Sequence, residues 1–243
     1  ETQRYINDTE WMLTYEANEV IVNSNYMKSE VQRLFGLPFE KINVVPNGVN
    51  LNKFTGMDRD YSFRRKYAMD NEKIILFMGR LVYEKGVQNL IAAMPKVLAS
   101  YHDAKLVIAG KGEFFDEYEK KFNNLQSNIK LLGWIEFDEY NNNLNDCDIY
   151  LHSSYFEPYG IPIVDAMLNG KIVIASDGVM SAIDNIKNEE NGFIYSKYDE
   201  KALCQILESF FYKNIDILHI GEKAKMIRNK FEYTYFDTIF SSF

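Results

Sequence analysis

Cysteine, proline and histidine are scarce in this 243-residue chain, and long apolar runs are missing. The two cysteines, Cys147 and Cys204, lie far apart in apolar patterns. This argues against a disulfide framework and predicts buried thiols in a reducing compartment. No apolar segment approaches the ~18–20 residues that span a bilayer, so we expect no transmembrane segment. The three histidines, His102, His152 and His219, lack metal-ligand spacing, and we expect no metal site.

Positive charge is also in short supply. The 27 Lys and Arg residues are outnumbered by 35 Asp and Glu residues, giving a formal net charge of −8. Nucleic acids and anionic lipid surfaces bind clustered Lys and Arg, so neither is expected as the main partner. The sequence begins at Glu1 and shows no signal peptide. We therefore expect a cytoplasmic protein of which an upstream portion is missing.

Hydrophobic residues, in contrast, make up 47% of the chain, enough for one large domain or two modest ones. Short apolar runs rich in β-branched residues lie at 20–22, 42–45, 74–78, 106–109, 129–132, 149–151, 172–175 and 193–195. Amphipathic segments with helical spacing lie at 87–100, 113–125, 136–146, 161–169 and 200–211. This alternation predicts an α/β fold: a Rossmann-like, doubly wound parallel sheet with ligands at the carboxyl ends of its strands.

The most informative segment, residues 154–167, follows one predicted strand and opens a helix. Glu157 lies in the loop, and Asp165 lies about two turns into the helix. Between them, the amides of Gly160 and Ile161 would be unpaired at the start of the helix. Such amides attract phosphate through hydrogen bonds and the helix dipole. Carboxylates that bind hydroxyls on both sides of an anion site suit a sugar nucleotide.

Three more loops follow predicted strands. Residues 79–86 place Arg80 and Lys85 after Gly79, and Arg suits forked contacts with phosphate. A weak Gly-x-Gly signal contains Lys111, which fits a tight turn equally well. The segment 132–135 follows the strand predicted at 129–132, and burial in the core is the commoner fate of residues such as its Trp134 and Ile135. All these loops should meet at one edge of the sheet.

The segment from Glu157 to Asp165 resembles the E-x7-E motif of retaining glycosyltransferases with the GT-B fold, the superfamily of glycogen and starch synthases. The resemblance covers the chain from about Glu16 onward and matches only the later half of such an enzyme. It implies a tail of the first GT-B domain and the linker at 1–56, a donor-binding second domain at 57–215, and terminal helices at 216–243. Those helices could cross back to the first domain or complete their own core.

The resemblance also implies roles for individual residues. It assigns catalytic roles to Glu157, Arg80 and Lys85, and donor-binding roles to Gly79, Gly160, Ile161, Asp165, Lys111 and Ile135. Glu157 would bind sugar hydroxyls and Asp165 the ribose, while the two cations stabilise the departing diphosphate. No metal or cofactor is implied. The expected partners are an ADP- or UDP-linked sugar donor and an acceptor sugar, glycan or other hydroxyl.

Two departures from the family pattern keep a second hypothesis open. Asp165 is one methylene shorter than Glu, and residues 176–184 contain a single glycine, Gly178, where the family usually has a pair. A non-catalytic nucleotide-sugar-binding module is therefore an alternative to an enzyme. A glycosidase or a sugar-nucleotide epimerase explains the motifs less well. The Asp146-Cys147-Asp148 segment spells a D-x-D metal motif, but Asp148 falls where the resembled family has a structural aspartate.

Overall fold

The computed structural model describes residues 2–54, 60–122, 127–212 and 216–231. Internal packing divides the chain into two compact units, one of residues up to Asn50 together with those from Asn229, and one of Leu51–Arg228. The division into 1–56, 57–215 and 216–243 stays a prediction. The end of the terminal segment, from residue 232, lies outside the described residues. Among the described residues, no helix has both the length and the apolarity to cross a membrane.

The first unit has the order helix, strand, helix and strand. Its elements are α1 (Thr2–Glu16), β1 (Val20–Val22), α2 (Asn25–Phe35) and β2 (Ile42–Val44). The two strands pair in parallel, and Ile42 is fully buried between them and α2. The helix α2 begins where the Ser24 hydroxyl accepts a hydrogen bond from the Met27 amide, at 3.0 Å. This is the capping geometry that favours serine before a helix.

The second unit is built on the predicted parallel sheet, whose six strands run in the order β5-β4-β3-β6-β7-β8. The strands are β3 (Lys73–Met78), β4 (Ala104–Ala109), β5 (Ile129–Gly133), β6 (Ile149–His152), β7 (Ile172–Ser176) and β8 (Phe193–Tyr195). All six coincide with predicted apolar runs. Their side chains are largely buried on both faces because helices cover both. The predicted α/β fold class is confirmed.

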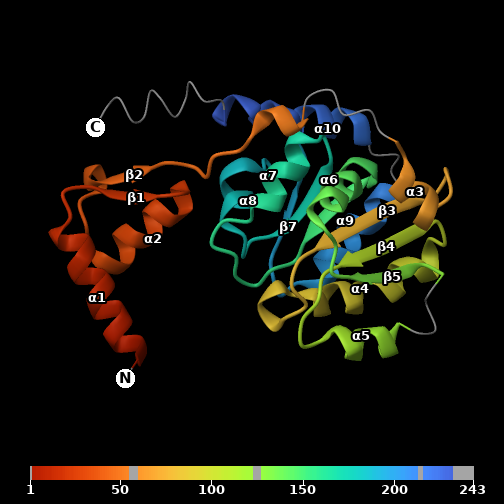
Figure 1. Cartoon of the computed structure of the whole chain (residues 1–243), viewed down its shortest axis with the longest axis horizontal. Coiled ribbons are helices and arrows are strands. Elements are labelled where there is room, and N and C mark those ends of the chain that lie inside the picture. Colours follow the sequence, from red (N-terminus) through yellow and green to blue (C-terminus); the bar gives the residue numbers. More distant parts are fainter. Residues whose placement is uncertain (1, 55–59, 123–126, 213–215, 232–243) are drawn as a thin grey trace. The chain divides into compact units, whose positions relative to one another are not determined.

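Helices cover the sheet from two sides (Figure 1). One side carries α4 (Val87–Ser100) and α5 (Phe115–Lys121), and α4 packs against α9 (Glu200–Tyr212). The other side carries α6 (Phe137–Asp146), α7 (Ile161–Leu168) and α8 (Met180–Asn185), with α10 (Ile217–Lys225) packed on α7. The six-residue helices α3 (Ser62–Tyr67) and α8 escaped the sequence analysis. They are too short to show a helical period.

The strand order reverses between β3 and β6. From β3 the chain moves to β4 and β5 on one side, and from β6 it moves to β7 and β8 on the other. Loops that leave such a switch point diverge, and the crevice between them is where α/β proteins bind ligands. The loop after β3 begins with Gly79 and Arg80, and the loop after β6 contains Glu157. The topology thus brings the two predicted loops to one place.

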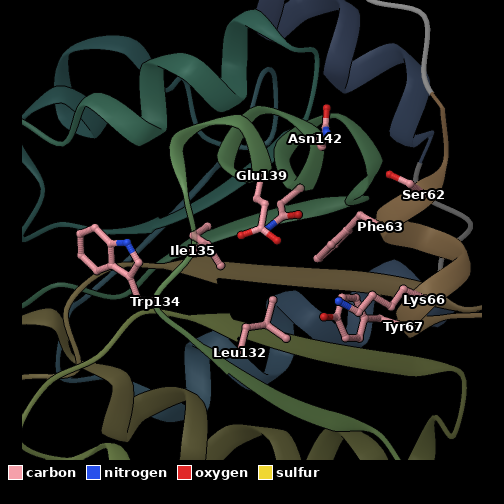
Figure 2. A pocket seen from close by; sticks show the side chains of 10 residues that line it. Ser62, Phe63, Lys66, Tyr67, Leu132, Trp134, Ile135, Glu139 and Asn142 are labelled. Atoms are coloured by element: carbon pink, nitrogen blue, oxygen red, sulfur yellow. The ribbon is translucent and has the colours of Figure 1, made fainter.

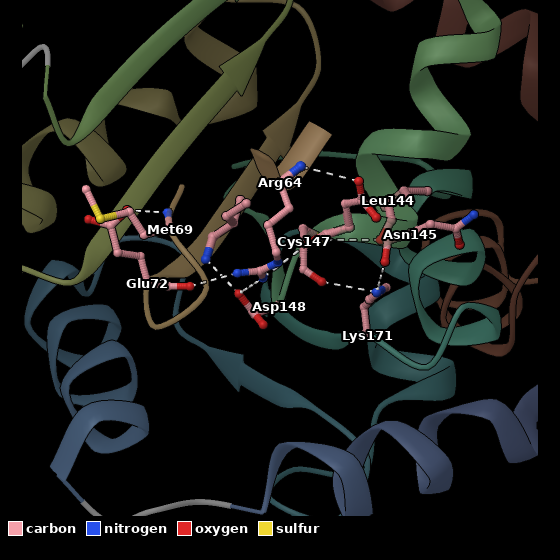
Figure 3. A network of polar contacts seen from close by, with 10 residues as sticks. Arg64, Met69, Glu72, Leu144, Asn145, Cys147, Asp148 and Lys171 are labelled. Carbon is pink, nitrogen blue, oxygen red and sulfur yellow. Dashed lines mark hydrogen bonds and ion pairs between the residues drawn. The ribbon is translucent and has the colours of Figure 1, made fainter. Parts of the chain in front are cut away.

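The opposite end of the sheet is held by the D-x-D segment, which serves structure here. The Asp148 carboxylate forms an ion pair with Arg64 of α3 and accepts the Ile74 amide at 2.8 Å. The Asp146 carboxylate accepts the Phe63 amide at 3.1 Å. Arg64 also donates to the carbonyl oxygen of Glu72 at 2.8 Å (Figure 3). The pair of acids therefore ties α3 to the start of β3. No group of acids, histidines or cysteines among the described residues could hold a metal ion.

The two cysteines are free and buried, as predicted. Cys147 directly follows α6, and its carbonyl oxygen accepts from the Lys171 ammonium at 3.1 Å. Cys204 lies on α9, where its thiol contacts the Ala93 carbonyl of α4. Burial raises the pKa of Cys204, so this thiol stays protonated and packs as a small apolar group.

Candidate functional site

The loops after β3 and β6 are joined by hydrogen bonds. The Tyr155 amide donates to the Glu84 carbonyl oxygen at 2.8 Å, and the Ser153 hydroxyl donates to the Lys85 carbonyl oxygen at 3.0 Å. The basic loop is therefore fixed to the acidic loop by its backbone. A loop held in this way presents its side chains in one geometry, whereas a solvated turn would not.

The fixed backbone brings the Lys85 ammonium onto the carboxylate of Glu157, and the two form an ion pair. Both side chains are less than one-fifth exposed. The Nε2 atom of His152 lies 3.5 Å from the same carboxylate oxygen. On the other side of the ring, Nδ1 lies 3.1 Å from the Tyr150 hydroxyl, which is also 3.4 Å from the Met78 carbonyl oxygen. The Glu157 carboxylate is thus contacted by both Lys85 and His152.

These contacts set the charge of the acid. Burial raises the pKa of Glu157, but the close approach of His152 and the hydrogen bond and charge of Lys85 outweigh it and lower the pKa to about 2. Burial lowers the pKa of His152 against the pull of Glu157, which favours the neutral imidazole. At neutral pH the cluster therefore holds one carboxylate and one ammonium. A carboxyl group this acidic binds hydroxyls well but donates no proton.

Helix α7 begins beside this cluster. Gly160 precedes the helix with φ +92°, in the left-handed region, and a Cβ there would lie 2.7 Å from Val179 and 3.3 Å from the Glu157 side chain. The loop before α8 holds the backbone of Glu157 in position, since the Glu157 amide donates to the Gly178 carbonyl at 2.9 Å. Pro162 has no N–H, and the Ile163 amide donates to the Gly160 carbonyl at 3.0 Å. This leaves the amides of Gly160 and Ile161 as the candidates for an anion.

A cavity of about 290 Å³ opens at the switch point. It is lined by the ends of β3, β4 and β5 and by residues of α6 and α7: Met78, Gly79, Arg80, Ala109, Gly110, Lys111, Trp134, Ile135, Tyr140 and Pro162. Arg80 is exposed at its wall, and no described residue forms a hydrogen bond or ion pair with its guanidinium. The cavity therefore has an uncompensated cation on one side and the first turn of α7 on another.

A tyrosine of the cavity wall contacts the second acid of the motif. The Tyr140 hydroxyl donates a hydrogen bond to Oδ2 of Asp165, at 2.8 Å. Burial and the Asp165 charge both raise the pKa of Tyr140, so its hydroxyl remains protonated. Asp165 follows Pro162 by three residues and so lies on the same face of α7. Tyr140 lines the cavity, whereas Asp165 does not.

A second cavity, of about 250 Å³, lies between α3 and α6. It shares Trp134 and Ile135 with the first one. Figure 2 shows Phe63 and Glu139 near its middle and the Trp134 indole at its edge, directed away from Lys66 and Tyr67. The short segment of Trp134 and Ile135 thus separates two hollows.

The predicted site residues fall into two neighbouring groups. The cavity wall contains Gly79, Arg80, Lys111 and Ile135, while Lys85 and Glu157 form the ion pair beside it. Gly160 and Ile161 lie at the start of α7. Asp165 lies further along α7 and accepts a hydrogen bond from Tyr140. One expectation is wrong: the Trp134 side chain is 72% exposed rather than buried.

Sequence reasoning missed the part played by Tyr140 and left that of His152 open. Tyr140 lies in the first turn of a helix that starts just after the carboxyl end of β5, which is a position that faces a ligand edge. His152 lies at the last position of β6, five residues before Glu157. The sequence signal that could have identified both residues is their position at or just after the carboxyl end of a strand. The hydrogen bonds themselves could not be read from one sequence.

A doubly wound domain with cationic and acidic loops at its switch point is a nucleotide-binding arrangement. The family profile "Glycosyl transferases group 1" matches residues 58–230, and "Glycosyltransferase Family 4" matches residues 1–53. The chain belongs to the group 1 glycosyl transferases, which confirms the resemblance seen in its motifs.

Two curated relatives illustrate the range of the family. An uncharacterized glycosyltransferase of Methanocaldococcus jannaschii is 38% identical over 199 residues, which are 79% of this chain and 50% of that protein. A glycogen synthase of Mycobacterium tuberculosis is 28% identical over 187 residues, covering 75% of this chain and 43% of that protein. The chain spans about half the length, or less, of these relatives.

Solved structures share the fold. Anabaena HepE in complex with UDP has a TM-score of 0.82 at 24% identity, covering 93% of this chain and 63% of that one. Sucrose-phosphate synthase of Thermosynechococcus elongatus has a TM-score of 0.80 at 20% identity, covering 98% and 62%. At these identities the likeness establishes the architecture alone.

Proposed function

We propose that this chain is the donor-binding part of a retaining glycosyltransferase that needs no divalent metal. The enzyme would move a sugar from a nucleoside diphosphate to a hydroxyl of a sugar, glycan or other acceptor. One observation carries the proposal: Arg80, which no described residue pairs with, and Pro162 at the start of α7 line the same cavity, and the Glu157 side chain of the Lys85–Glu157 pair lies next to Gly160, the residue before α7. A diphosphate between them would meet a cation, the amides at the start of α7 and a fixed ion pair.

The two cations have different surroundings. Lys85 is already paired with Glu157, so the pair adds little net charge, although the ammonium has three N–H donors and only one is needed for Glu157. Among the residues that the structure describes, none pairs with Arg80, and its guanidinium can present its planar fork to phosphate oxygens. Arg80 therefore supplies the positive charge that would otherwise come from a metal ion. Lys85 contributes hydrogen bonds and positions Glu157.

In the proposed reaction the bond between the sugar C1 and the diphosphate oxygen breaks, and the oxygen keeps the electron pair. The acceptor oxygen forms the new bond to C1 on the same face, and its proton passes to the departing phosphate. Arg80 stabilises the charge that develops on the leaving group. Losing one such preorganised donor typically costs ~3–4 kcal/mol, or a factor of about 10²–10³ in rate.

Glu157 has a separate role in this scheme. Its carboxylate stays ionised down to pH values near its pKa of about 2, so it accepts hydrogen bonds from sugar hydroxyls and does not act as a proton donor. A glycosidase needs one carboxyl group with a raised pKa as its general acid. Glu157 has the opposite shift. Glu157 therefore does not fit the part of the general acid in such a pair.

The donor is proposed to be a UDP- or ADP-linked sugar. The solved neighbour from Anabaena was obtained with UDP, with UDP and glucose, and with UDP-glucose, which supports a uridine donor by analogy of fold. Neither the cavity lining nor the motifs distinguish uracil from adenine, so both remain in the proposal.

A thermal-shift panel of nucleoside diphosphates, without divalent metal, tests donor binding. At 100 times its dissociation constant, a bound nucleotide stabilises the folded state by about 2.7 kcal/mol. We expect at least one nucleoside diphosphate to raise the melting temperature of the wild type and to lose that effect in Arg80→Ala. The retained anomeric configuration is checked by NMR of the product formed by the full-length enzyme. An inverted product would contradict the proposal.

The alternative is a nucleotide-sugar-binding module without catalysis. It is supported by the departure from the family motif at Asp165, which stands in place of the second glutamate. Turnover separates the two. Transfer or donor hydrolysis by the full-length protein that is absent in Arg80→Ala favours the enzyme. Nucleotide binding without turnover in any longer version of the protein favours the module.

A further inference from the structure

Three tyrosine rings form a cluster at the carboxyl edge of the sheet. Tyr83 follows β3, Tyr155 follows β6 and Tyr198 follows β8. The Tyr155 ring is the central one, with its centroid 5.2 Å from that of Tyr83 and 5.1 Å from that of Tyr198. Tyr83 and Tyr155 each precede a member of the Lys85–Glu157 pair by two residues. Two of the three rings therefore lie on the loops that form the candidate site.

Hydrogen bonds from the first turn of α4 hold this tyrosine cluster together. The Asn89 side chain accepts from the Tyr155 hydroxyl at 3.1 Å and donates to the Lys197 carbonyl oxygen at 2.7 Å. The Gln88 side chain donates to the Tyr83 carbonyl oxygen at 3.1 Å. All three loops are thus tied to one helix, and a surface ordered in advance loses less entropy when a ligand binds.

The two outer rings of the cluster are exposed. Tyr83 is 60% exposed and Tyr198 is 71% exposed, whereas Tyr155 is partly buried between them. Among the described residues, none forms a hydrogen bond with the hydroxyl of Tyr83 or Tyr198. A tyrosine offers a large, rigid apolar ring with a polar tip at a low cost in conformational entropy. The cluster is therefore an amphipathic surface available to a ligand.

The charges around the cluster restrict what that ligand can be. Glu84 directly follows Tyr83, Asp199 directly follows Tyr198, and both acids are exposed. The Lys197 ammonium lies 5.6 Å from the centre of the Tyr198 ring. Two carboxylates beside one ammonium disfavour phosphates and anionic lipid headgroups, but both kinds of group can hydrogen-bond to hydroxyls. A neutral, hydroxyl-rich molecule with an apolar C–H face fits this surface, and a sugar ring has both properties.

We propose that the tyrosine cluster is a sugar-binding surface that holds neutral sugar units of a glycan acceptor. The C–H faces of these units pack on the exposed rings of Tyr83 and Tyr198, and their hydroxyls bond to the phenols and the neighbouring acids. This inference rests on the proposed function and narrows its acceptor to an oligosaccharide or polysaccharide. The units bound here are distinct from the one whose hydroxyl reacts.

Oligosaccharide binding to the 243-residue chain tests the inference. The probes are neutral tetrasaccharides of α-linked glucose, β-linked glucose, mannose and N-acetylglucosamine, titrated while the NMR signals of 3-fluorotyrosine rings are followed. We expect at least one probe to bind the wild type and to shift the ring signals of Tyr83 and Tyr198. Tyr83→Ala and Tyr198→Ala should each weaken that binding by about tenfold, the size of one aromatic stacking contact.

Two further variants separate stacking from a general effect on the protein. Tyr198→Phe keeps the ring, so it should lose less affinity than Tyr198→Ala. Tyr212→Ala is the matched control, because Tyr212 is 73% exposed and lies on α9 outside the cluster, and it should bind the probe as the wild type does. Circular dichroism confirms that each variant is folded.

The outcomes separate this inference from the proposed function. Nucleoside diphosphate binding by the wild type without binding of any tetrasaccharide would overturn the sugar-binding surface and leave the proposed function intact. Tetrasaccharide binding that neither alanine variant weakens, or that Tyr198→Phe loses as fully as Tyr198→Ala, would also overturn it. Binding of phosphatidylcholine vesicles in place of tetrasaccharides would replace it with a membrane surface. Tetrasaccharide binding without binding of any nucleoside diphosphate would contradict the proposed function, and the acceptor role would fall with it.

Discussion

Replacing Glu157 with glutamine should remove a pH-dependent part of the folding stability. In the folded protein the pKa of this carboxyl is about 2, against an ordinary value of 4.5, because His152 and Lys85 bond to it. A group with a depressed folded-state pKa stabilises the fold above the unfolded pKa and loses that contribution as the pH falls through the folded one. The stabilising contribution of Glu157 is therefore lost as the pH falls from 4.5 to about 2.

The size of the effect follows from the two pKa values. One pKa unit corresponds to ~1.4 kcal/mol, so the ionised Glu157 contributes about 3 kcal/mol at neutral pH. By linkage, most of this contribution has gone by pH 2.5. The free energy of unfolding of the wild type should therefore exceed that of Glu157→Gln by about 2–3 kcal/mol more at pH 6 than at pH 2.5. Any constant cost of leaving Lys85 unpaired cancels in this comparison.

Urea unfolding followed by circular dichroism between pH 6 and pH 2.5 measures this difference. Glu200→Gln is the matched control, because Glu200 pairs with Lys96, whose side chain is 65% exposed, and an exposed pair contributes little. Its stability should follow that of the wild type across the range. Parallel pH curves for the wild type and Glu157→Gln would refute the reasoning, because they would show that the fold does not hold the Glu157 carboxylate as described.

Three further predictions concern the frame and the cavity. Arg64→Leu should lower the free energy of unfolding by ~3 kcal/mol in urea titrations, since it leaves the partly buried Asp148 without its cation; wild-type stability would contradict the structural role of this ion pair. Gly110→Ala should weaken nucleoside diphosphate binding by more than about tenfold in calorimetry, because φ is +142° and a Cβ would lie 1.8 Å from the Gly79 carbonyl oxygen. Gly48→Ala, in open space, should not weaken it. A chelator should leave nucleotide affinity unchanged, and a large loss would show that a metal takes part.

The sheet could be predicted because its strands are short, mostly apolar runs, and most of them are rich in β-branched residues. The run at 74–78 corresponds to β3 and the run at 172–175 to β7, since a strand buried on both faces has few alternatives. The helices α3 and α8 could not be predicted in this way. Each has six residues, and α3 is held by its contacts with Asp146 and Asp148, more than 80 residues further along the chain. Such long-range capping leaves no local pattern.

The candidate site was predictable in outline because the motif loops follow strand ends. Arg80 and Lys111 line the cavity for this reason. The partners were not predictable. Lys85 meets Glu157 only because the two loops are joined through Ser153 and Tyr155, and no spacing in the sequence encodes that bond. The resembled motif placed two cations on one diphosphate, and the structure shows that one of them is already paired.

A crystal structure of the chain with a bound nucleoside diphosphate would test the central claim most directly. We predict that the diphosphate lies in the cavity lined by Arg80 and Pro162, with the guanidinium and the amides of Gly160 and Ile161 within hydrogen-bonding distance of its oxygens. A nucleotide bound elsewhere, for example between α3 and α6, or a diphosphate remote from Arg80, would contradict the account.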